Sequence, residues 1–270
     1  MSSDVLDGTT PAPPTEPKPF FSRPAGKIFV IWFVMTVVGV VISLIAPHHL
    51  MPSMISEQGN TAVKTVIVFS VLAAPVAALV YAVATYSLLA WRRGSQETPP
   101  EDGPPLRGNT PLTIVWLIVS SFLCIVLLVW GLAELSAEAA THPGALQVDV
   151  TGQQWLWTYS YPGTGVQSRT LVLPLDRPVQ FNVTSEDVTH GFWSMALGVQ
   201  VDANPHVVTT LQATPNRLGS FTVRCSQVCG IYHAFMYSPG EVVTTAQFAA
   251  WLQSQGASAV SATRVSRAGS

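Results

Sequence analysis

The chain has 270 residues, of which only 10% are charged and 48% are hydrophobic, and its formal net charge is −2. Together with a mean hydropathy of +0.36, this composition favours a membrane protein. The small negative charge gives no indication of nucleic-acid binding, and the length permits one or two domains.

Three uncharged hydrophobic stretches occupy the first half of the chain, and a membrane-spanning helix needs about 20 apolar residues. We therefore predict a membrane anchor over 28–134 with helices at about 28–46, 65–91 and 112–132. Basic residues precede the first stretch, as in a secretory signal, but it exceeds the ~7–15 apolar residues of a signal and no small-residue cleavage site follows. We interpret it as a retained helix that ends at Pro47. Residues 1–27, rich in Pro, Ser and Thr, are predicted to be a disordered cytoplasmic tail.

The positions of lysine and arginine predict the orientation. The N-terminal tail and the polar segment around 92–111 contain Lys18, Arg23, Lys27, Arg92, Arg93 and Arg107, whereas the segment 47–63 contains none. By the positive-inside rule, the tail and the 92–111 loop lie in the cytoplasm. Three crossings of the cell membrane then place everything after Glu134 on the extracytoplasmic side.

From Ala145 onward the pattern changes to short β-branched and aromatic segments separated by Gly, Pro, Asn and Asp. This spacing predicts an all-β sandwich or barrel over 145–255. The expected strands are Leu146–Thr151, Trp155–Tyr161, Thr170–Leu173, Val179–Thr184, Val207–Ala213, Ser220–Arg224 and Glu241–Thr245. A short helix is predicted at Phe248–Gln253, and a disordered tail over 256–270.

Potential metal ligands are concentrated between Arg224 and Met236, in R-C-S-Q-V-C-G-I-Y-H-A-F-M, with His190 upstream in S-E-D-V-T-H-G-F-W. Thiolate and thioether ligands select copper or iron–sulfur clusters over hard cations. A disulfide between Cys225 and Cys229 is an equally simple interpretation of the two cysteines alone. Zinc fits less well, because the spacing is C-x3-C and there is no second cysteine pair. A mononuclear blue-copper site needs one cysteine, so the second cysteine favours two bridged copper ions.

The segment C-S-Q-V-C-G-I-Y-H-A-F-M, with V-T-H-G-F-W upstream, resembles the binuclear copper (CuA) site of cytochrome c oxidase subunit II, whose pattern is C-x-E-x-C-G-x-x-H-x-x-M. The resemblance implies a cupredoxin-like Greek-key domain and a site for two copper ions. It implies as partners the haem–copper oxidase subunit I, other oxidase subunits, and cytochrome c or a similar donor. It assigns two bridging cysteines, two capping histidines, one weak ligand and one backbone carbonyl: Cys225 and Cys229, His190 and His233, Met236, and Gln227.

The segment G-Q-Q-W-L-W-T-Y-S-Y places Trp155, Trp157, Tyr159 and Tyr161 at alternate positions, hence on one face of a strand. A half-buried core face is the ordinary interpretation of such a pattern. The segment is also similar to the family's aromatic region, G-x-Q-W-x-W-x-Y-x-Y, in which an exposed tryptophan receives the electron from the donor. This implies that electrons enter at Trp155, with Trp157 as the alternate.

Asp202, in V-D-A-N-P, matches the Asp and Pro of the family's K-x-D-x-x-P-G, while Gln200 and His206 replace its Lys and Gly. An acidic residue here could help dock a basic cytochrome c, and a turn-forming Asp is the alternative. Gln227 replaces the family glutamate that helps to bind magnesium; a neutral amide is a weaker ligand for a hard cation, so the magnesium site is doubtful. Thr113 occupies the position of a glutamate at the mouth of the family's proton path, and a hydroxyl cannot titrate.

These patterns predict the non-catalytic electron-transfer subunit of a respiratory terminal oxidase, an oxidoreductase and translocase complex. Electrons would pass from cytochrome c through the copper centre to the haem-containing subunit I, which reduces oxygen to water. Two alternatives stay open. The missing carboxylate at Thr113 also suits the copper-bearing subunit of a nitric oxide reductase. A membrane-anchored copper-binding assembly protein would need the same ligands, but not the aromatic segment. The chain contains no C-x-x-C-H, the motif for an attached c-type haem.

Overall fold

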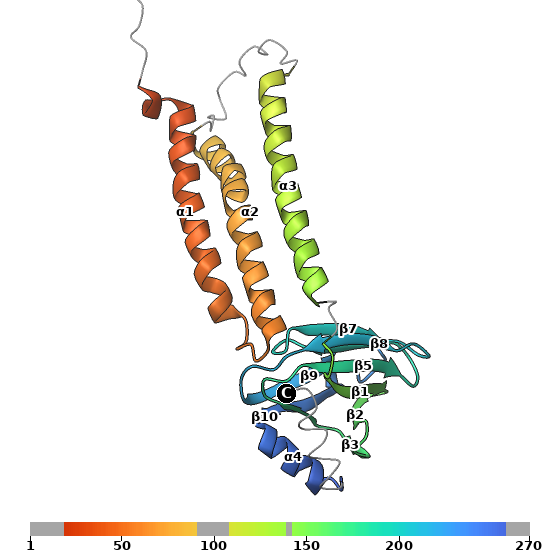
Figure 1. Cartoon of the computed structure of the whole chain (residues 1–270). Helices are drawn as coiled ribbons and strands as arrows, with labels where there is room; N and C mark the ends of the chain where they lie inside the picture. Colours follow the sequence, from red (N-terminus) through yellow and green to blue (C-terminus); the bar gives the residue numbers. More distant parts are fainter. Residues whose placement is uncertain (1–18, 91–107, 139–141, 258–270) are drawn as a thin grey trace, which may run out of the picture. The chain divides into compact units, whose positions relative to one another are not determined.

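The computed structural model describes residues 19–90, 108–138 and 142–257 (Figure 1). Within these ranges, three long helices come first in the chain and the β-strands follow. The contacts define two compact units, one within residues 1–43 and 70–102, and the other within residues 44–69 and 103–270. The predicted tail segments 1–18 and 258–270 lie outside the described residues.

Three helices are long and apolar enough to cross a membrane: α1 (Pro24–Leu50), α2 (Glu57–Ala90) and α3 (Thr110–Glu138). Most of their large apolar side chains are exposed, which suits helices whose surroundings are lipid rather than water. α1 and α2 approach closely at Gly39, where an added Cβ would lie 3.3 Å from Ala74 Cβ. Near this point, Trp32 Nε1 donates a hydrogen bond to the carbonyl of Pro75, 2.8 Å away.

Each helix extends beyond its predicted apolar stretch, so the predicted bounds were wrong. α1 already begins at Pro24, inside the segment predicted as a tail, and Pro47 lies inside the helix rather than at its end. A proline removes only one backbone donor, and the last turn continues to Leu50. α2 begins at Glu57, because Ser56 Oγ accepts a hydrogen bond from the N–H of Gly59 (2.9 Å) and caps the helix. A cap, which hydropathy does not detect, thus sets the start of α2.

The β-domain is a sandwich of two five-stranded sheets, with strand orders β3-β2-β1-β5-β8 and β4-β10-β9-β6-β7. Pairing is parallel between β1 and β5 and between β4 and β10, and antiparallel elsewhere. The strands are β1 (Leu146–Gln153), β2 (Leu156–Tyr161), β3 (Val166–Ser168), β4 (Leu171–Pro174), β5 (Val179–Ser185), β6 (His190–Ser194), β7 (Val199–Ala203), β8 (Thr209–Ala213), β9 (Gly219–Cys225) and β10 (Tyr237–Val243).

The core of the sandwich follows from the two-residue period of its strands. In β1 and β5 buried and half-buried residues alternate, because successive side chains of a strand point to opposite faces. The inward positions are apolar and fully buried, and they include Val148, Val150, Phe181, Phe192 and Val223. The all-β fold class predicted for this part of the chain is therefore confirmed.

Three strands escaped the sequence analysis: β3, β6 and β7. β6 (H-G-F-W-S) contains a glycine and lies beside a run of turn residues, so its pattern does not indicate a strand. β10 begins at Tyr237, earlier than predicted, and continues through Pro239 and Gly240. Gly240 is required there, because an added Cβ would lie 2.2 Å from the Phe221 ring. Trp155, predicted to start a strand, instead lies in the turn between β1 and β2.

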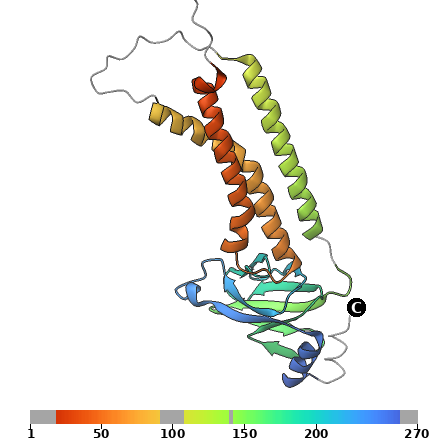
Figure 2. The same cartoon turned by 90° about the vertical axis from the view of Figure 1, so that its left-hand side faces the viewer.

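The C-terminal helix α4 (Thr245–Ser254) covers one end of the β-domain (Figure 2, blue). Thr244 and Gln247 form a capping box at its start. Phe248 and Leu252 are fully buried, and Trp251 meets the Tyr161 ring edge-on with the ring centroids 5.1 Å apart. The prediction of a short helix at Phe248–Gln253 is thus confirmed, with a longer extent.

The segment 54–60, which includes the first turn of α2, is hydrogen-bonded to the β-domain. Ile55 N–H donates to the Ala196 carbonyl, and Asn216 N–H donates to the Ile55 carbonyl, both at 2.9 Å. Ser56 Oγ donates to the Leu197 carbonyl at 2.6 Å. Gly198, with φ +65°, allows close approach of this segment, because an added Cβ would lie 2.5 Å from the backbone of Gly59. These contacts hold the segment against the edge of the β-domain.

Candidate metal centre

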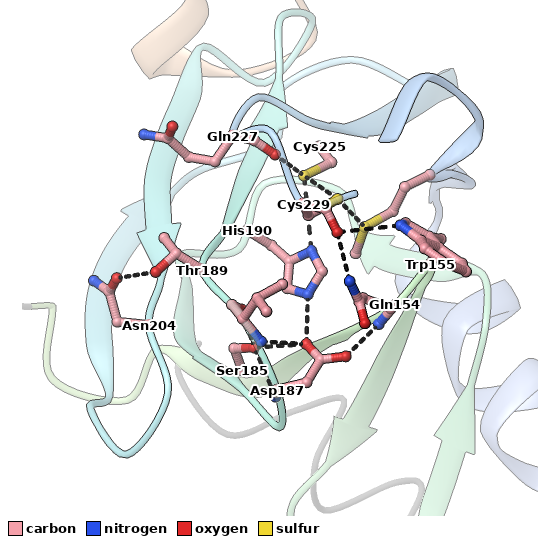
Figure 3. Close-up of polar contacts among 12 residues, drawn as sticks. Gln154, Trp155, Ser185, Asp187, Thr189, His190, Asn204, Cys225, Gln227 and Cys229 are labelled. Atoms are coloured by element: carbon pink, nitrogen blue, oxygen red, sulfur yellow. Dashed lines mark hydrogen bonds and ion pairs between the residues drawn. The ribbon is translucent and has the colours of Figure 1, made fainter. Parts of the chain in front are cut away.

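Two cysteine sulfurs form the centre of the site (Figure 3). Cys225, at the end of β9, and Cys229 are both buried and unpaired, with their Sγ atoms 3.7 Å apart. This separation is far longer than the ~2.05 Å of a disulfide bond. The structure therefore presents two free thiols that face each other, as a bridging pair requires.

The remaining predicted ligands surround these two sulfurs. Cys225 Sγ lies 3.9 Å from His190 Nδ1 and 3.1 Å from the Gln227 carbonyl oxygen. Cys229 Sγ lies 3.6 Å from His233 Nδ1 and 3.7 Å from Met236 Sδ. Donor atoms of His190 and the two cysteines all lie within 4.8 Å of one another. The structure thus brings together every residue that the sequence analysis nominated as a ligand.

The sheet and the ligand loop, residues 226–236 between β9 and β10, place these residues. The Cys225 N–H donates to the Met236 carbonyl (3.0 Å), which closes the base of the loop. The Ser226 N–H donates to the carbonyl of Gly191 in β6, also at 3.0 Å. Gly191 has to be a glycine, because an added Cβ would lie 2.1 Å from Ser226 Oγ. The loop therefore lies directly on β6, the strand that begins with His190.

Asp187 orients the buried histidine. His190 is completely buried, and its Nε2 lies 2.8 Å from Asp187 Oδ1. With the Nε2 proton donated to this carboxylate, Nδ1 presents its lone pair towards the sulfurs, a common arrangement for a metal-binding histidine. Burial alone would raise the pKa of Asp187, but hydrogen bonds from the Gln154 N–H, His190 and the Val188 N–H outweigh it and lower the pKa. The carboxylate therefore stays ionised as an acceptor.

Burial also affects the sulfur ligands. Desolvation, followed by the hydrogen bond and charge of Cys225, raises the pKa of the Cys229 thiol to about 12. In the metal-free chain at neutral pH this thiol is protonated, although thiolate is the form that binds metal. Metal binding must therefore displace its proton, which makes affinity pH-dependent.

The β1–β2 turn contacts the ligand loop from the other sheet. Gln154 Nε2 and Trp155 Nε1 both donate to the Cys229 carbonyl, at 2.7 and 3.3 Å (Figure 3). The Trp155 ring is half-buried and meets the exposed Tyr232 ring edge-on, with centroids 4.8 Å apart. Gly230, with φ +124°, permits this approach, since an added Cβ would lie about 3.2 Å from the Trp155 ring. Trp155 thus lies between the surface and the backbone of a ligand.

Trp157, the alternate position for electron entry into the chain, lies in the core of the β-domain. Its side chain is 1% exposed, and its ring lies edge-on to those of His190 and Phe192, at centroid distances of 6.0 and 5.7 Å. Gly152 makes room for this packing, because an added Cβ would lie 3.0 Å from His190 Cδ2 and 3.1 Å from Trp157. Trp157 therefore supports His190 from the core and presents no surface to a donor protein.

The structure also shows the positions of Asp202 and Thr113, two further residues noted in the sequence. Asp202, in β7, is half-buried and accepts a hydrogen bond from Gln227 Nε2 at 3.0 Å. Thr113, in the first turn of α3, donates its hydroxyl to the carbonyl of Asn109, the residue just before the helix (3.1 Å). Sequence reasoning missed Asp187 and Gln154 as supporting residues. The only sequence signal for Asp187 was its position three residues before His190, as one of the two acidic residues in the S-E-D-V-T-H segment.

The surface of the ligand loop is apolar. Val228, Ile231, Tyr232, Phe235 and Tyr237 are all at least half exposed. No residue from Cys225 to Gly240 is Asp, Glu, Lys or Arg. Exposed apolar groups of this kind, gathered around a functional site, are typical of surfaces that contact another protein. We refer to these five side chains as the loop surface.

The fold and the side chains gathered in it define a membrane protein with a cupredoxin-like β-domain that carries a cluster of soft candidate metal ligands. Several known proteins are similar to this chain. Residues 164–243 match the family described as "Cytochrome C oxidase subunit II, periplasmic domain". Cytochrome c oxidase subunit 2 of Synechocystis is 28% identical over 269 residues, covering 80% of each chain. The chain belongs to the cytochrome c oxidase subunit II family.

Two further proteins are similar to this chain. Cytochrome c oxidase subunit 2 of Thermostichus vulcanus is 25% identical over 272 residues, covering 79% of this chain and 82% of that protein. The crystal structure of the periplasmic domain of subunit II of cytochrome oxidase (CoxB) of Bradyrhizobium japonicum is 30% identical, with a TM-score of 0.41. It covers 43% of this chain and 96% of that one. The related proteins are subunits of an oxidoreductase complex.

Proposed function

We propose that this chain is the subunit through which electrons enter a respiratory terminal oxidase. It would accept electrons from cytochrome c or a similar donor and deliver them to the haem-containing subunit I, which reduces oxygen to water. The observation that carries the proposal is the convergence of two free cysteine sulfurs 3.7 Å apart with two imidazoles, a thioether and a backbone carbonyl. In this proposal the chain itself makes no bond in the substrate.

The donor set fits two copper ions of the CuA type. Thiolate, imidazole and thioether ligands suit copper, and the second thiolate exceeds what one blue-copper ion uses. When bound, the copper pair supplies a one-electron redox couple. The chain's own residues hold the ligands still: Asp187 fixes the His190 ring, and hydrogen bonds from Gln154 and Trp155 restrain the Cys229 carbonyl. Rigid, buried ligands limit rearrangement on a change of charge.

The route into the site begins at Trp155 in this proposal. Its ring contacts Tyr232 on the loop surface, and its Nε1 donates to the Cys229 carbonyl. A donor protein that docks on the loop surface would therefore lie near a ring that is hydrogen-bonded to a ligand residue. A docking role for Asp202 stays a prediction, and so do three membrane crossings that place the domain on the extracytoplasmic side of the cell membrane.

A nitric oxide reductase is the second candidate for the complex, and one observation favours it. Thr113 occupies the family's proton-path position, and a hydroxyl is not titratable; it donates to the carbonyl of Asn109, just before α3. The route for electrons into the chain would be the same. Oxygen and nitric oxide consumption by the purified complex, measured with the same donor, distinguishes the two candidates.

The decisive experiment is electron paramagnetic resonance of the purified complex, together with copper quantification. We expect two coppers per chain and a hyperfine pattern from one unpaired electron shared by both. Cys229→Ser should abolish this signal. Cys124→Ser, which changes the exposed cysteine of α3, is the matched control and should preserve it. The spectrum of a single copper, or full activity of Cys229→Ser with unaltered copper content, contradicts the proposal.

A second experiment tests the route through Trp155. Trp155→Phe removes the hydrogen bond to the Cys229 carbonyl and should slow oxidation of the donor protein about tenfold or more, which corresponds to ~1.4 kcal/mol in the barrier. Copper content and the rate with a small inorganic reductant should remain unchanged. Trp251→Phe, on α4, is the control for tryptophan loss. An unaltered donor rate in Trp155→Phe places the point of entry elsewhere.

A further inference from the structure

Two side chains of β7 reach the ligand loop. Gln200 and Asp202 are two residues apart on the strand and so lie on the same face. Gln200 Nε2 donates to Ser226 Oγ at 3.3 Å, and Asp202 Oδ1 accepts from Gln227 Nε2 at 3.0 Å. β7 is the edge strand of its sheet and pairs with β6. Both hydrogen bonds therefore connect the edge of the sheet to the first residues of the ligand loop.

Gly191 explains how β7 reaches across β6. Asp202 is the residue opposite Gly191 in the β6–β7 pair. Any side chain at position 191 would collide with Ser226, and the Ser226 N–H instead donates to the Gly191 carbonyl at 3.0 Å. The loop therefore lies directly on the backbone of β6, within reach of the β7 side chains. Gln227 is held at two points: its amide at Asp202, and its carbonyl oxygen 3.1 Å from Cys225 Sγ.

We infer that Asp202 is a positioning residue for the metal centre, and that its hydrogen bond to Gln227 takes the place of the magnesium ion that the family glutamate at this position helps to bind. This inference rests on the proposed copper site. Asp202 touches no ligand atom. It fixes the side chain of Gln227 and thereby the direction of the Gln227 carbonyl towards Cys225.

The residues do not fit magnesium. Magnesium is usually bound through carboxylates, but Gln227 has only one neutral amide oxygen to offer, and its N–H₂ group, a donor, points towards the Asp202 carboxylate. That bond engages Asp202 Oδ1. The family pattern has a lysine at position 200 and a glutamate at position 227. Both are glutamines here, so the contact between β7 and the ligand loop lacks one positive and one negative charge. In this chain the amides of Gln200 and Gln227 and the carboxylate of Asp202 hold the loop. In the family pattern a lysine, a glutamate and a magnesium ion would be expected there.

The positioning role is tested in the intact complex by copper electron paramagnetic resonance and optical absorption. We expect Asp202→Ala and Gln227→Ala to retain both coppers and to shift the hyperfine pattern in the same way. The double variant should shift it no further. Asp202→Asn keeps an acceptor oxygen for the amide and should restore the wild-type spectrum. Glu241→Ala, which removes an exposed carboxylate of β10, is the control and should change nothing.

The outcomes separate this inference from the proposed function. A binuclear signal in the wild type that Asp202→Ala leaves identical overturns the inference alone, as does a shift in Asp202→Ala that Asp202→Asn fails to reverse. Absence of the binuclear signal in the wild type overturns both. For the cation, the complex is freed of divalent ions and then equilibrated with Mn²⁺. We expect no bound Mn²⁺ that depends on residue 227, and bound Mn²⁺ that Gln227→Ala removes contradicts the inference.

Discussion

The two histidines of the candidate metal centre lie in different surroundings. His190 belongs to strand β6, is completely buried, and has its Nε2 held by Asp187. His233 belongs to a short 3-10 turn (His233–Phe235), is partly exposed, and contacts Cys229 Sγ through Nδ1. Within the described part of the chain, its Nε2 has no hydrogen-bond partner. One imidazole is therefore fixed by the core of the domain, and the other is held by the loop alone.

The candidate site therefore has two parts, one around His190 and one around His233, and we expect them to have different roles. The His190 part is continuous with the sandwich core through Trp157, Phe192 and Gly152, so its geometry is set when the domain folds. The His233 part lies beside the loop surface, where Ile231 and Phe235 are 82% and 70% exposed. It is accessible to whatever protein contacts that surface. Substitutions should therefore alter folding on the first side and partner contact on the second.

The largest difference is expected between His190→Ala and His233→Ala in the copper-free chain. Loss of the buried His190 ring leaves a cavity and removes the partner of Asp187, so we expect the free energy of unfolding to fall by about 2–4 kcal/mol. His233→Ala should change it by less than about 1 kcal/mol. Denaturant unfolding in detergent, followed by tryptophan fluorescence, measures both. Equal losses would abolish the distinction between the two parts.

A methyl group at Gly152 tests the core side alone. In Gly152→Ala the new Cβ would lie 3.0 Å from His190 Cδ2 and 3.1 Å from Trp157, so overpacking should destabilise the domain by about 1–3 kcal/mol. Thr151→Ala, at the adjacent half-buried position, should stay within about 0.5–1 kcal/mol of the wild type. The same unfolding assay applies. An unchanged midpoint for Gly152→Ala would mean that His190 is less tightly packed than its contacts indicate.

Alkaline pH should affect the copper-free chain in particular. Burial raises the pKa of the Cys229 thiol from 9.0 to about 12, so between these pH values the folded chain binds more protons than the unfolded chain. Stability therefore falls as pH rises through this window. Burial also raises the pKa of Tyr159 and of Tyr161, so part of the slope should remain in every form of the chain. The copper-loaded chain, whose sulfurs would already be deprotonated, and copper-free Cys229→Ser should both show a shallower slope than the copper-free wild type. A slope in Cys229→Ser as steep as in the wild type would assign the whole effect to the tyrosines.

The smallest effect on stability is expected on the loop surface. Ile231→Ala removes a side chain that is 82% exposed, so the free energy of unfolding should change by no more than about 0.5 kcal/mol. If the loop surface contacts the donor protein, the same substitution should raise KM for the donor while copper content stays constant. Donor titrations of the complex measure this. A loss of stability comparable to that of Gly152→Ala would show that the loop depends on its exposed side chains.

The sequence predicted the candidate ligands from one short ordered motif that contains Cys225, Cys229, His233 and Met236, and the structure brings these side chains together. Residues that support them from distant segments could not be found in this way. Gln154 and Asp187 meet the site only because β1 pairs in parallel with β5, which brings the turn after β1 beside the segment after β5. Such a pairing depends on tertiary structure and leaves no local pattern.

The boundaries of helices and strands were also hard to predict from local sequence patterns. The apolar stretches revealed all three long helices, but the starts of α2 and α3 depend on single capping contacts, Ser56 Oγ with the Gly59 N–H and Asn109 Oδ1 with the Leu112 N–H. Trp155 follows the alternation of Trp157 and Tyr159 in sequence, yet it lies in the turn before β2 and faces the ligand loop. The pattern of alternate aromatic residues therefore predicted the core face correctly and placed the first tryptophan in the wrong kind of structure.

The segment Met54–Asn60 has a consequence for anyone who wishes to excise the domain for study in water. A fragment that begins near Ala145 would lack Ile55 and Ser56, both buried against the β-domain. It would leave the Ala196 and Leu197 carbonyls and the Asn216 N–H without the partners they have in the chain. A soluble version would be better made by grafting residues 54–60 onto the fragment through a short linker than by simple truncation.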